Sequence, residues 1–267
     1  TYKNIKPTYF IFKYFWYNVT MQRRQKNLLG YNIDLFNVEE ALDYSNSLID
    51  SAKSSHIVTI NPEIIEYANK HENFAKILKE AELVIPDGIG IKIGLKINGE
   101  NVQRITGIGF AHSLLENAQK NNIPVALVGA KPHVIEKAYE NLKQEMPELN
   151  VVYKHDGYFK DCKQEVIDGI KNASPKLLLV ALGAPMQEEF IYELKSILPS
   201  TLMIGIGGSF DVWAGEVQRA PEIWQKLGLE WLYRTIKQPE RFKRIFPTLP
   251  LFVYNVIKEK FTKKEVL

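Results

Sequence analysis

The sequence predicts an α/β protein with a doubly wound, mainly parallel, Rossmann-like sheet and a helical C-terminal appendage. Short apolar segments such as HIVTI (56–60) and KLLLVAL (176–182) lack the alternation of half-exposed strands, as expected for parallel strands buried on both faces. Segments with helical periodicity separate them, and this alternation is typical of a parallel sheet covered by helices on both faces. No strand pattern follows Gly215, so the remainder is expected to be helical.

The elements follow in a regular order. We expect strands, the first of which could be a hairpin, at 28–36, 56–60, 82–85, 124–129, 150–154, 176–182 and 201–206. We expect helices at 38–53, at 62–81 in one or two pieces, from 88 onward with interruptions at its glycines, and at 107–121, 131–146, 162–173 and 185–197. The predicted organisation is an extension or tag at 1–21, an α/β core at 22–215 and the appendage at 216–267.

Composition and charge limit the function classes. The 267 residues are 45% hydrophobic and 24% charged, which is ordinary for a globular protein. The single cysteine, Cys162, excludes an internal disulfide framework and fits a reducing cytoplasm. The net charge of +3 is unevenly spread, because residues 1–28 carry six Lys/Arg and no acid, and residues 231–267 carry nine Lys/Arg against three acids. Basic ends on an acidic body favour an anionic surface as partner and argue against nucleic-acid binding.

The N-terminal twenty residues contain eight aromatic side chains without helical periodicity. Lys13 interrupts the apolar stretch and no small-residue cleavage site follows, so the pattern indicates neither a spanning helix nor a signal peptide. A dispensable extension or tag and an aromatic anchor at a membrane interface both remain open.

Four short motifs follow apolar segments at the predicted strand ends. They are Thr59-Ile-Asn61-Pro62-Glu63, Pro86-Asp87-Gly88-Ile-Gly90, Gly183-Ala-Pro185-Met-Gln187-Glu188 and Gly205-Ile-Gly207-Gly208-Ser209-Phe210-Asp211. Because the carboxyl ends of parallel strands line the ligand crevice of an open α/β sheet, we expect the four motifs to converge on one site.

Asp87 is the candidate general base, because a carboxylate at a strand end can accept a proton from a substrate hydroxyl. Its alternative is a turn aspartate before Gly88. Gly88 itself is a candidate contact, because a glycine lets a ligand approach the backbone. Thr59 and Asn61 could contact a sugar or phosphate, whereas Asn61 followed by Pro62 also fits the start of a helix.

The third and fourth motifs fit an anionic ligand. Gln187 is expected near a helix N-terminus, where backbone N–H groups favour anions. A turn of small residues can hold a diphosphate or a base. The candidate contacts here are Gly183, Gln187, Gly207, Gly208, Ser209 and Asp211.

These motifs resemble the WecG/TagA/CpsF glycosyltransferases, and among them the TagA-type N-acetylmannosaminyltransferases. The similarity covers about residues 22–247 and includes Arg104-Ile-Thr106-Gly107, Arg219-Ala220-Pro221, Gly228-Leu229-Glu230-Trp231-Leu232-Tyr233-Arg234 and Pro239-Glu240-Arg241. One position departs from the family pattern: Gly109 stands where an aspartate is common, so no role for that aspartate carries over.

The resemblance implies an inverting transfer of N-acetylmannosamine from a UDP-sugar to N-acetylglucosamine on undecaprenyl diphosphate, a step in teichoic acid synthesis. It implies that Asp87 is the base and that Arg104 helps to bind the substrates. It also implies a cytoplasmic enzyme that is peripheral on the inner face of the cell membrane. A homo-oligomer is left open.

No metal or cofactor is expected. The chain contains no Asp-x-Asp sequence and no His/Asp/Glu cluster with metal-ligand spacing. Charge on the leaving UDP would then be balanced by cationic side chains and helix N-termini.

The appendage supplies such cations. Arg234, Lys237, Arg241 and Arg244 recur at helical spacing, although Pro239 must kink or break the helix between them. Arg234, Arg241 and Arg244 are therefore predicted at a diphosphate, with a solvated basic helix face as the alternative. Beyond them, LPLFVYNVI (249–257) and the lysines that follow are typical of an interfacial segment on an anionic membrane leaflet.

Two other functions stay open. Gly88-Ile-Gly90-Ile-Lys-Ile-Gly94 imitates a dinucleotide fingerprint, although it does not lie in the first βα unit, so an NAD(P)-dependent oxidoreductase is one alternative. A non-catalytic, membrane-associated module that binds a sugar nucleotide is the other.

Overall fold

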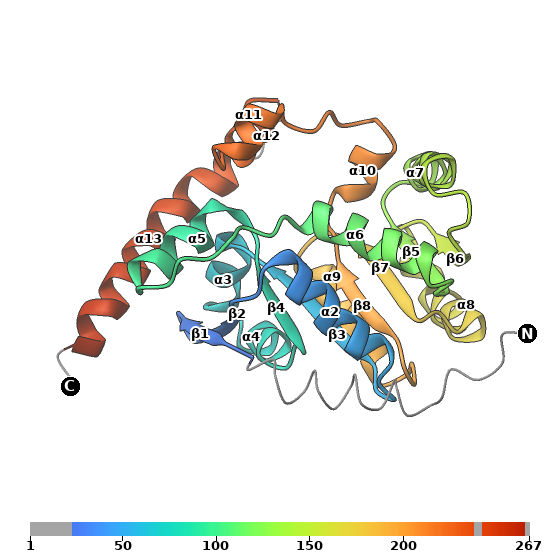
Figure 1. Cartoon of the computed structure of the whole chain (residues 1–267), viewed down its shortest axis with the longest axis horizontal. Helices are drawn as coiled ribbons and strands as arrows, with labels where there is room; N and C mark the ends of the chain where they lie inside the picture. The colour runs from blue at the N-terminus through green and yellow to red at the C-terminus, as the bar shows by residue number, and fades with distance from the viewer. Residues whose placement is uncertain (1–22, 238–241, 265–267) are drawn as a thin grey trace, which may run out of the picture.

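The fold is built on a parallel sheet of six strands in the order β4-β3-β8-β7-β5-β6, with a separate antiparallel hairpin β1-β2 (Figure 1). The computed structural model describes residues 23–237 and 242–264. The strands are β1 (Gln25–Leu28), β2 (Tyr31–Asp34), β3 (Ser55–Ile60), β4 (Leu83–Pro86), β5 (Val125–Gly129), β6 (Val151–His155), β7 (Leu177–Ala181) and β8 (Leu202–Gly205). The predicted mainly parallel sheet is confirmed.

Helices fill the connections between the strands. They are α2 (Val38–Ile49), α3 (Pro62–Ala68), α4 (Glu72–Lys79), α5 (Gly88–Ile97), α6 (Gly107–Lys120), α7 (Pro132–Glu145), the 3₁₀ turn η1 (Lys160–Cys162), α8 (Lys163–Ala173), α9 (Met186–Lys195), α10 (Ser209–Trp213), α11 (Glu222–Lys226), α12 (Glu230–Lys237) and α13 (Phe242–Lys264).

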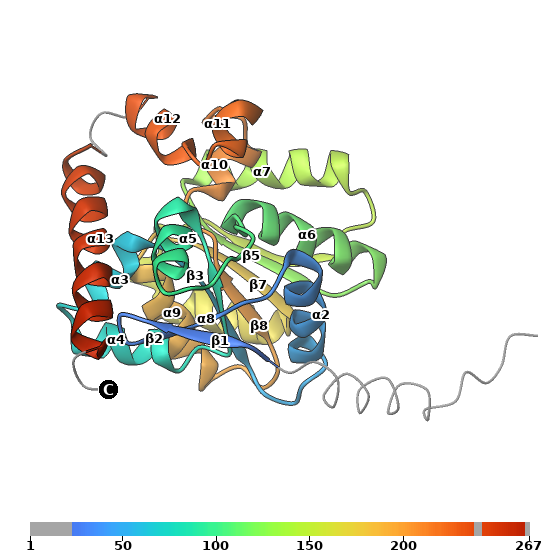
Figure 2. The same ribbon diagram turned by 60° about the vertical axis from the view of Figure 1, so that its left-hand side comes forward.

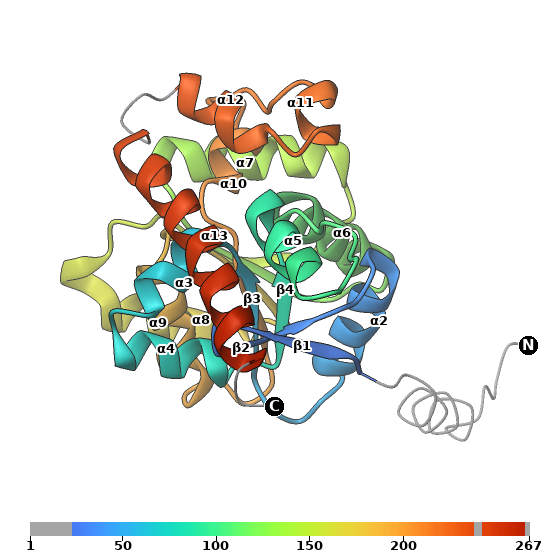
Figure 3. The same cartoon turned by 90° about the vertical axis from the view of Figure 1, so that its left-hand side faces the viewer.

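Strands β3, β4, β5, β7 and β8 are buried on both faces. Ile57 packs into a core with residues of α2, α6, α7 and α10, while its neighbour Val58 packs into a core with residues of α3, α4 and α5. A third cluster joins β5, β7 and β8 to α8 and α9. Successive side chains of a strand point to opposite faces, which explains the continuous apolar segments in the sequence. Figure 3 shows the two helical layers on either side of the sheet.

The C-terminal helices divide into two parts. α11 and α12 lie side by side, and α13 runs along α3 and α5 (Figure 2). Phe252 and Val256 of α13 are fully buried in the same cluster as Leu28 of the hairpin. Asn255 Nδ2 also donates to Glu66 Oε1 at 2.9 Å. Helix α13 therefore completes the core at the β4 edge of the sheet.

Most predicted elements are found, with one correction. The segment 62–81 forms two helices, and the first strand forms a hairpin. The helix from Gly88 is not interrupted by its glycines but runs continuously to Ile97. A β-carbon on Gly90 would lie 2.4 Å from Pro62 Cγ, and one on Gly94 would lie 3.2 Å from Phe252 Cζ. These glycines therefore serve close packing of α5 against its neighbours.

Some predictions are not tested by the fold. Residues 1–21, Pro239 and Arg241 lie outside the described residues. The domain boundary after Gly215 stays a prediction, although Phe252 and Val256 show that α13 shares the core of the α/β body. No helix within the described ranges is long and apolar enough to cross a membrane.

Candidate active site

A cavity of about 610 Å³ opens at the carboxyl ends of β3, β4, β7 and β8. The helices that follow the neighbouring strands β3 and β8 are α3 and α10, and they pack on opposite faces of the sheet. The crevice between two such strands is the usual ligand position in this architecture. The cavity brings together ten of the predicted site residues: Thr59, Asn61, Asp87, Gly88, Arg104, Gly183, Gln187, Gly207, Gly208 and Ser209. The four motifs converge as expected.

Asp87 is the first residue after β4 and precedes α5. Asp87 occupies the N-cap position of α5, but its side chain makes no capping hydrogen bond to this helix. Gly88 has a φ of +82°, a conformation that glycine adopts without strain. A β-carbon on Gly107 would lie 3.4 Å from Asp87 Oδ2 and 3.3 Å from Thr59 Cγ2. Gly107 thus lets the start of α6 approach both side chains closely.

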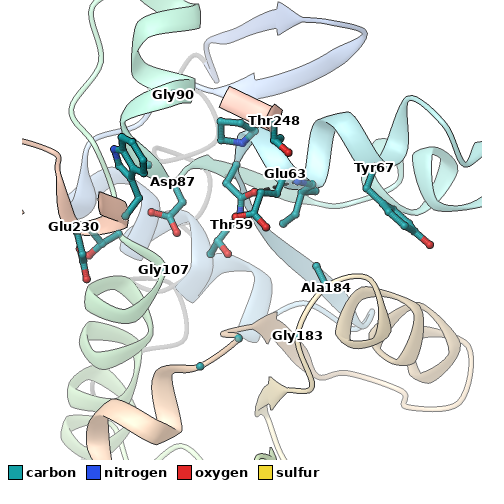
Figure 4. A pocket seen from close by; sticks show the side chains of 18 of the residues that line it. Thr59, Glu63, Tyr67, Asp87, Gly90, Gly107, Gly183, Ala184, Glu230 and Thr248 are labelled. Carbon is teal, nitrogen blue, oxygen red and sulfur yellow. Dashed lines mark hydrogen bonds between the residues drawn. The ribbon is translucent and has the colours of Figure 1, made fainter. Parts of the chain in front are cut away.

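Figure 4 shows how Asp87 lies in the cavity, with Glu230 on one side and Thr59 and Glu63 on the other. Tyr67 lies at the far end of the same view. The carboxylate is half-buried and lines the cavity, a position from which it can meet a bound hydroxyl group.

Thr59 and Asn61 have structural partners as well as a place in the cavity. Asn61 Oδ1 accepts a hydrogen bond from Ile64 N at 3.0 Å and caps α3, as predicted. Thr59 Oγ1 donates to the carbonyl of Gly205 at 3.4 Å, which joins β3 to β8. Capping by Asn61 is confirmed, and contact of either residue with a ligand stays a prediction.

Gln187 lies in the first turn of α9, as expected, and its side chain also has structural partners. Its Oε1 accepts hydrogen bonds from the backbone N–H of Gly207 at 2.9 Å and of Gly183 at 3.2 Å. Its Nε2 donates to Glu188 Oε1 at 2.8 Å. The buried amide therefore holds two glycine turns of the cavity together, and contact of Gln187 with an anionic ligand stays a prediction.

Glu188 fixes the orientation of this amide. The carboxyl is almost completely buried, and burial raises its pKa to about 7, although the hydrogen bond from Gln187 opposes the rise. A β-carbon on Gly205 would lie 2.4 Å from Gln187 Nε2 and 3.0 Å from Glu188 Oε1. The glycine of β8 thus makes room for both side chains.

Ser209 and Asp211 begin the short helix α10. Ser209 Oγ donates to the carbonyl of Ile206 at 2.6 Å and is buried, so its only donor is already used. Asp211 is half-buried and is not among the described residues that line the cavity. Of the predicted contacts outside the appendage, only Asp211 is not brought to the cavity wall.

The C-terminal helices complete the cavity. Glu230 Oε2 accepts from Arg104 Nη2 at 3.1 Å, and Arg219 Nε lies 3.9 Å from Glu230 Oε1. Sequence reasoning did not single out the lining residues Glu230, Trp231, Thr248 and Leu249. The first two belong to the 228–234 segment that carried the family resemblance, which was the available signal.

The opposite end of the cavity was also missed. Glu63, Tyr67 and Lys70 line it together with Phe74. The Tyr67 ring stacks on His71 at 3.8 Å between centroids and meets Phe74 edge-on at 5.1 Å. Positions 63, 67 and 70 share one side of a helical wheel, opposite the core-facing Ile64 and its neighbours, so helical periodicity could have identified this wall.

The predicted arginines of the appendage cannot be placed at the site. Arg234 belongs to α12 and Arg244 to α13, but their side chains, like the whole of Arg241, lie outside the described residues. Their contact with a diphosphate stays a prediction. Within residues 23–237 and 242–264, no group of three or more His, Cys, Asp or Glu could hold a metal ion, and metal independence also stays a prediction.

Comparison with known proteins decides the family. Residues 26–266 match the family described as "Glycosyl transferase WecG/TagA/CpsF family". The chain belongs to this family. The glycine pattern of the NAD(P) alternative lies inside α5, and membership in a glycosyltransferase family supports the transferase over the oxidoreductase and the non-catalytic module.

Three similar curated relatives share one name, N-acetylglucosaminyldiphosphoundecaprenol N-acetyl-beta-D-mannosaminyltransferase. The protein of Bacillus spizizenii is 38% identical over 213 residues, which cover 79% of this chain and 82% of the relative. That of Bacillus subtilis is 36% identical over 230 residues, covering 85% and 89%. That of Staphylococcus aureus is 35% identical over 211 residues, covering 79% and 82%.

Proposed function

We propose that this protein transfers N-acetylmannosamine from UDP-N-acetylmannosamine to N-acetylglucosamine on undecaprenyl diphosphate, with inversion at the anomeric carbon. The product would be an intermediate of the wall teichoic acid linkage unit. The name shared by the relatives supports the lipid-linked acceptor and the transferred sugar. The observation that carries the chemistry is Asp87, whose carboxylate lines the cavity without capping α5.

The proposed reaction is a single displacement. Asp87 removes the proton of the acceptor hydroxyl while that oxygen attacks the anomeric carbon of the donor sugar. The bond between this carbon and the UDP oxygen breaks on the opposite face, and UDP leaves with the electron pair. Inversion follows because one displacement occurs at one carbon.

Cationic groups stabilise the departing diphosphate in this proposal. Arg104 lines the cavity, and its guanidinium suits phosphate oxygens. Arg234, Arg241 and Arg244 are proposed to join it, on the strength of their helical spacing in the sequence. The glycine turns held by Gln187 would border the sugar nucleotide, with Thr59 and Asn61 near the transferred sugar.

The lipid acceptor requires contact with a membrane. The C-terminal helices expose a set of large apolar side chains: Ile223, Leu227, Ile236, Phe246, Leu251, Tyr254, Ile257 and Phe261. Such a surface beside basic residues supports peripheral binding to the anionic inner face of the cell membrane. With the C-terminal helices on the membrane, the cavity would receive the lipid-linked sugar from the membrane and the UDP-sugar from the cytoplasm.

The test is release of UDP in the presence of a short-chain lipid-diphosphate-N-acetylglucosamine. UDP-N-acetylmannosamine, UDP-N-acetylglucosamine and NADH are offered separately. We expect UDP release and a disaccharide product with the first donor. Turnover with UDP-N-acetylglucosamine alone would change the donor assignment, and consumption of NADH would overturn the transferase assignment.

A further inference from the structure

The carboxylate of Glu230 lies between two arginines and contacts them unequally. Its Oε2 accepts a hydrogen bond from Arg104 Nη2 at 3.1 Å. Its Oε1 lies 3.9 Å from Arg219 Nε, which is within the range of an ion pair but too far for a hydrogen bond. One anionic side chain is therefore shared by two guanidinium groups, with the hydrogen bond on the side of Arg104.

The Arg219 nitrogen beside Glu230 is an unpaired donor. Arg219 Nε is buried, and it has no hydrogen-bond partner among residues 23–237 and 242–264. Buried donors are satisfied in the large majority of cases, because an unpaired N–H loses its bond to water without replacement. Since this atom has almost no accessible surface, its partner must come from the protein, and the structure places Glu230 Oε1 beside it.

The backbone around Arg219 is held in place. Ala220, the next residue, is buried, and its carbonyl accepts a hydrogen bond from Gln225 Nε2 at 2.6 Å. Closing the 3.9 Å separation to an ordinary hydrogen bond needs a shift of about 1 Å. A rearrangement of the Glu230 side chain is therefore enough to satisfy Arg219 Nε.

An anion in the cavity would supply the reason for this rearrangement. Arg104 and Glu230 both line the cavity, and their side chains are only 14% and 11% exposed. An anion bound at Arg104 would meet the carboxylate of Glu230 at the same guanidinium, and like charges repel more strongly there than in water. Arg219 is not among the described residues that line the cavity, so a shift toward it takes the carboxylate away from the ligand side.

We infer that Glu230 changes its hydrogen-bond partner from Arg104 to Arg219 when the diphosphate of the sugar nucleotide binds at Arg104. The inference rests on the proposed function, in which Arg104 stabilises the departing diphosphate. Arg219 is then a positioning residue, because it acts through Glu230 and not on the substrate. The exchange leaves the guanidinium of Arg104 available to phosphate oxygens.

The test is a double-mutant cycle on ligand affinity. It compares wild type, Arg219→Gln, Glu230→Gln and the double variant, and urea unfolding checks that each is folded. Dissociation constants are measured by calorimetry for two probes separately, UDP and inorganic pyrophosphate. The matched control is Arg24→Gln, because Arg24 pairs with Glu100 at 3.3 Å at an exposed position and is not among the described lining residues.

We expect Arg219→Gln to weaken binding of both probes about tenfold in the wild-type background, because the ligand-bound state loses a hydrogen bond between charged groups. In the Glu230→Gln background the same change should alter both constants by less than about twofold, since no carboxylate has to move. Arg24→Gln should bind both probes as wild type does.

Two results of the cycle would overturn the inference. An equal loss in both backgrounds would mean that Arg219 acts on the ligand without Glu230. Unchanged binding by Arg219→Gln in the wild-type background would mean that Glu230 stays on Arg104 when the ligand binds.

A spectroscopic measurement on the wild-type protein gives a second test. The ¹⁵N–¹H signal of Arg219 Nε, assigned by its loss in Arg219→Lys, should move to lower field on adding pyrophosphate, because the N–H gains a carboxylate partner. An unmoved signal at saturating pyrophosphate, or no binding of pyrophosphate by wild type, would overturn the inference. The proposed function has a separate failure: a protein that shows the exchange with pyrophosphate but transfers no sugar from UDP-N-acetylmannosamine would support the inference and contradict the proposed function.

Discussion

Arg104 and Glu230 form an ion pair that joins the α/β core to the C-terminal helices. Arg104 Nη2 lies 3.1 Å from Glu230 Oε2, and the two side chains are 14% and 11% exposed. Both residues line the cavity, so the same contact that holds α12 on the core also orients a cation at the site. Removal of either partner leaves the other as a poorly solvated charge.

This pair should show strong coupling. In a double-mutant cycle of Arg104→Ala and Glu230→Ala, the free energies of unfolding should deviate from additivity by about 1.5–3 kcal/mol, the range for a hydrogen bond between charged groups. The measurement is urea unfolding of the four proteins. The control cycle is Lys137→Ala with Glu140→Ala, an exposed pair that should show a coupling near zero. Additive effects at 104 and 230 would mean that the contact does not hold the helices together.

Asp87→Asn should separate chemistry from binding. If Asp87 removes the acceptor proton, the amide cannot replace it, and turnover should fall by roughly 10²–10⁴. UDP binding should stay within a few-fold of wild type. The control is Asp161→Asn, the same change at an exposed position of η1, which should leave turnover unchanged. Near-normal turnover of Asp87→Asn would show that Asp87 is not the general base and has only a structural role in the turn.

Local signals explain what the sequence could predict. The buried strands are visible as continuous apolar segments, and the cap at Asn61 depends only on residues up to Ile64. The convergence of the motifs follows because parallel strands end at one edge of a sheet.

The remaining features depend on contacts between distant residues. Arg104 meets Glu230 across 126 positions of sequence, and Gln187 bridges Gly183 and Gly207 through an amide that the sequence does not orient. Gly90 and Gly94 suggested breaks in a helix, but their role became visible only with Pro62 and Phe252 packed against them. Tertiary packing therefore decided each of these features over local propensity.

Activity should not require a divalent metal. Leaving-group charge is assigned in the proposed reaction to arginine side chains. Turnover in excess EDTA should therefore stay within about twofold of the untreated enzyme, measured as UDP release. A parallel sample with added Mg²⁺ controls for ionic strength. An enzyme that loses activity in EDTA and recovers with Mg²⁺ would contradict this assignment.

Glu188 should make stability depend on pH. Its pKa is raised from 4.5 to about 7, so between these values the folded protein keeps a proton that the unfolded chain releases. The free energy of unfolding contributed by this group therefore falls as pH rises from about 4.5 to 7, by up to about 3 kcal/mol. Glu188→Gln keeps an acceptor for Gln187 and removes the titration. The melting temperature of Glu188→Gln should therefore exceed that of wild type by an amount that increases from about pH 4.5 to 7 and stays constant above pH 7.

The control for this titration is Glu148→Gln, at an exposed position that does not contribute to the Glu188 pKa. Its melting temperature should follow that of wild type at every pH, because the carboxylate stays in water in both states. A Glu188→Gln curve parallel to wild type would show that Glu188 does not retain a proton near neutral pH.

Two phenylalanines of α13 should have opposite phenotypes. Phe252 is 0% exposed and packs with the hairpin and α5, whereas Phe261 is 62% exposed. Phe252→Ala should lower the free energy of unfolding by about 3–5 kcal/mol, because a cavity remains in the core. Phe261→Ala should change it by less than about 0.5 kcal/mol. Thermal and urea unfolding of the two variants gives this comparison.

Vesicle binding should depend on Phe261 and not on Phe252. If the exposed apolar side chains of α13 enter the membrane interface, Phe261→Ala should weaken sedimentation with phosphatidylcholine–phosphatidylglycerol vesicles about tenfold, since a buried phenylalanine contributes roughly 1.5–3 kcal/mol. Phe252→Ala, measured below its melting temperature, should bind as wild type does because its ring faces the protein. Equal vesicle binding by all three proteins would place the membrane contact elsewhere, and α13 would then serve only to complete the core and the cavity wall.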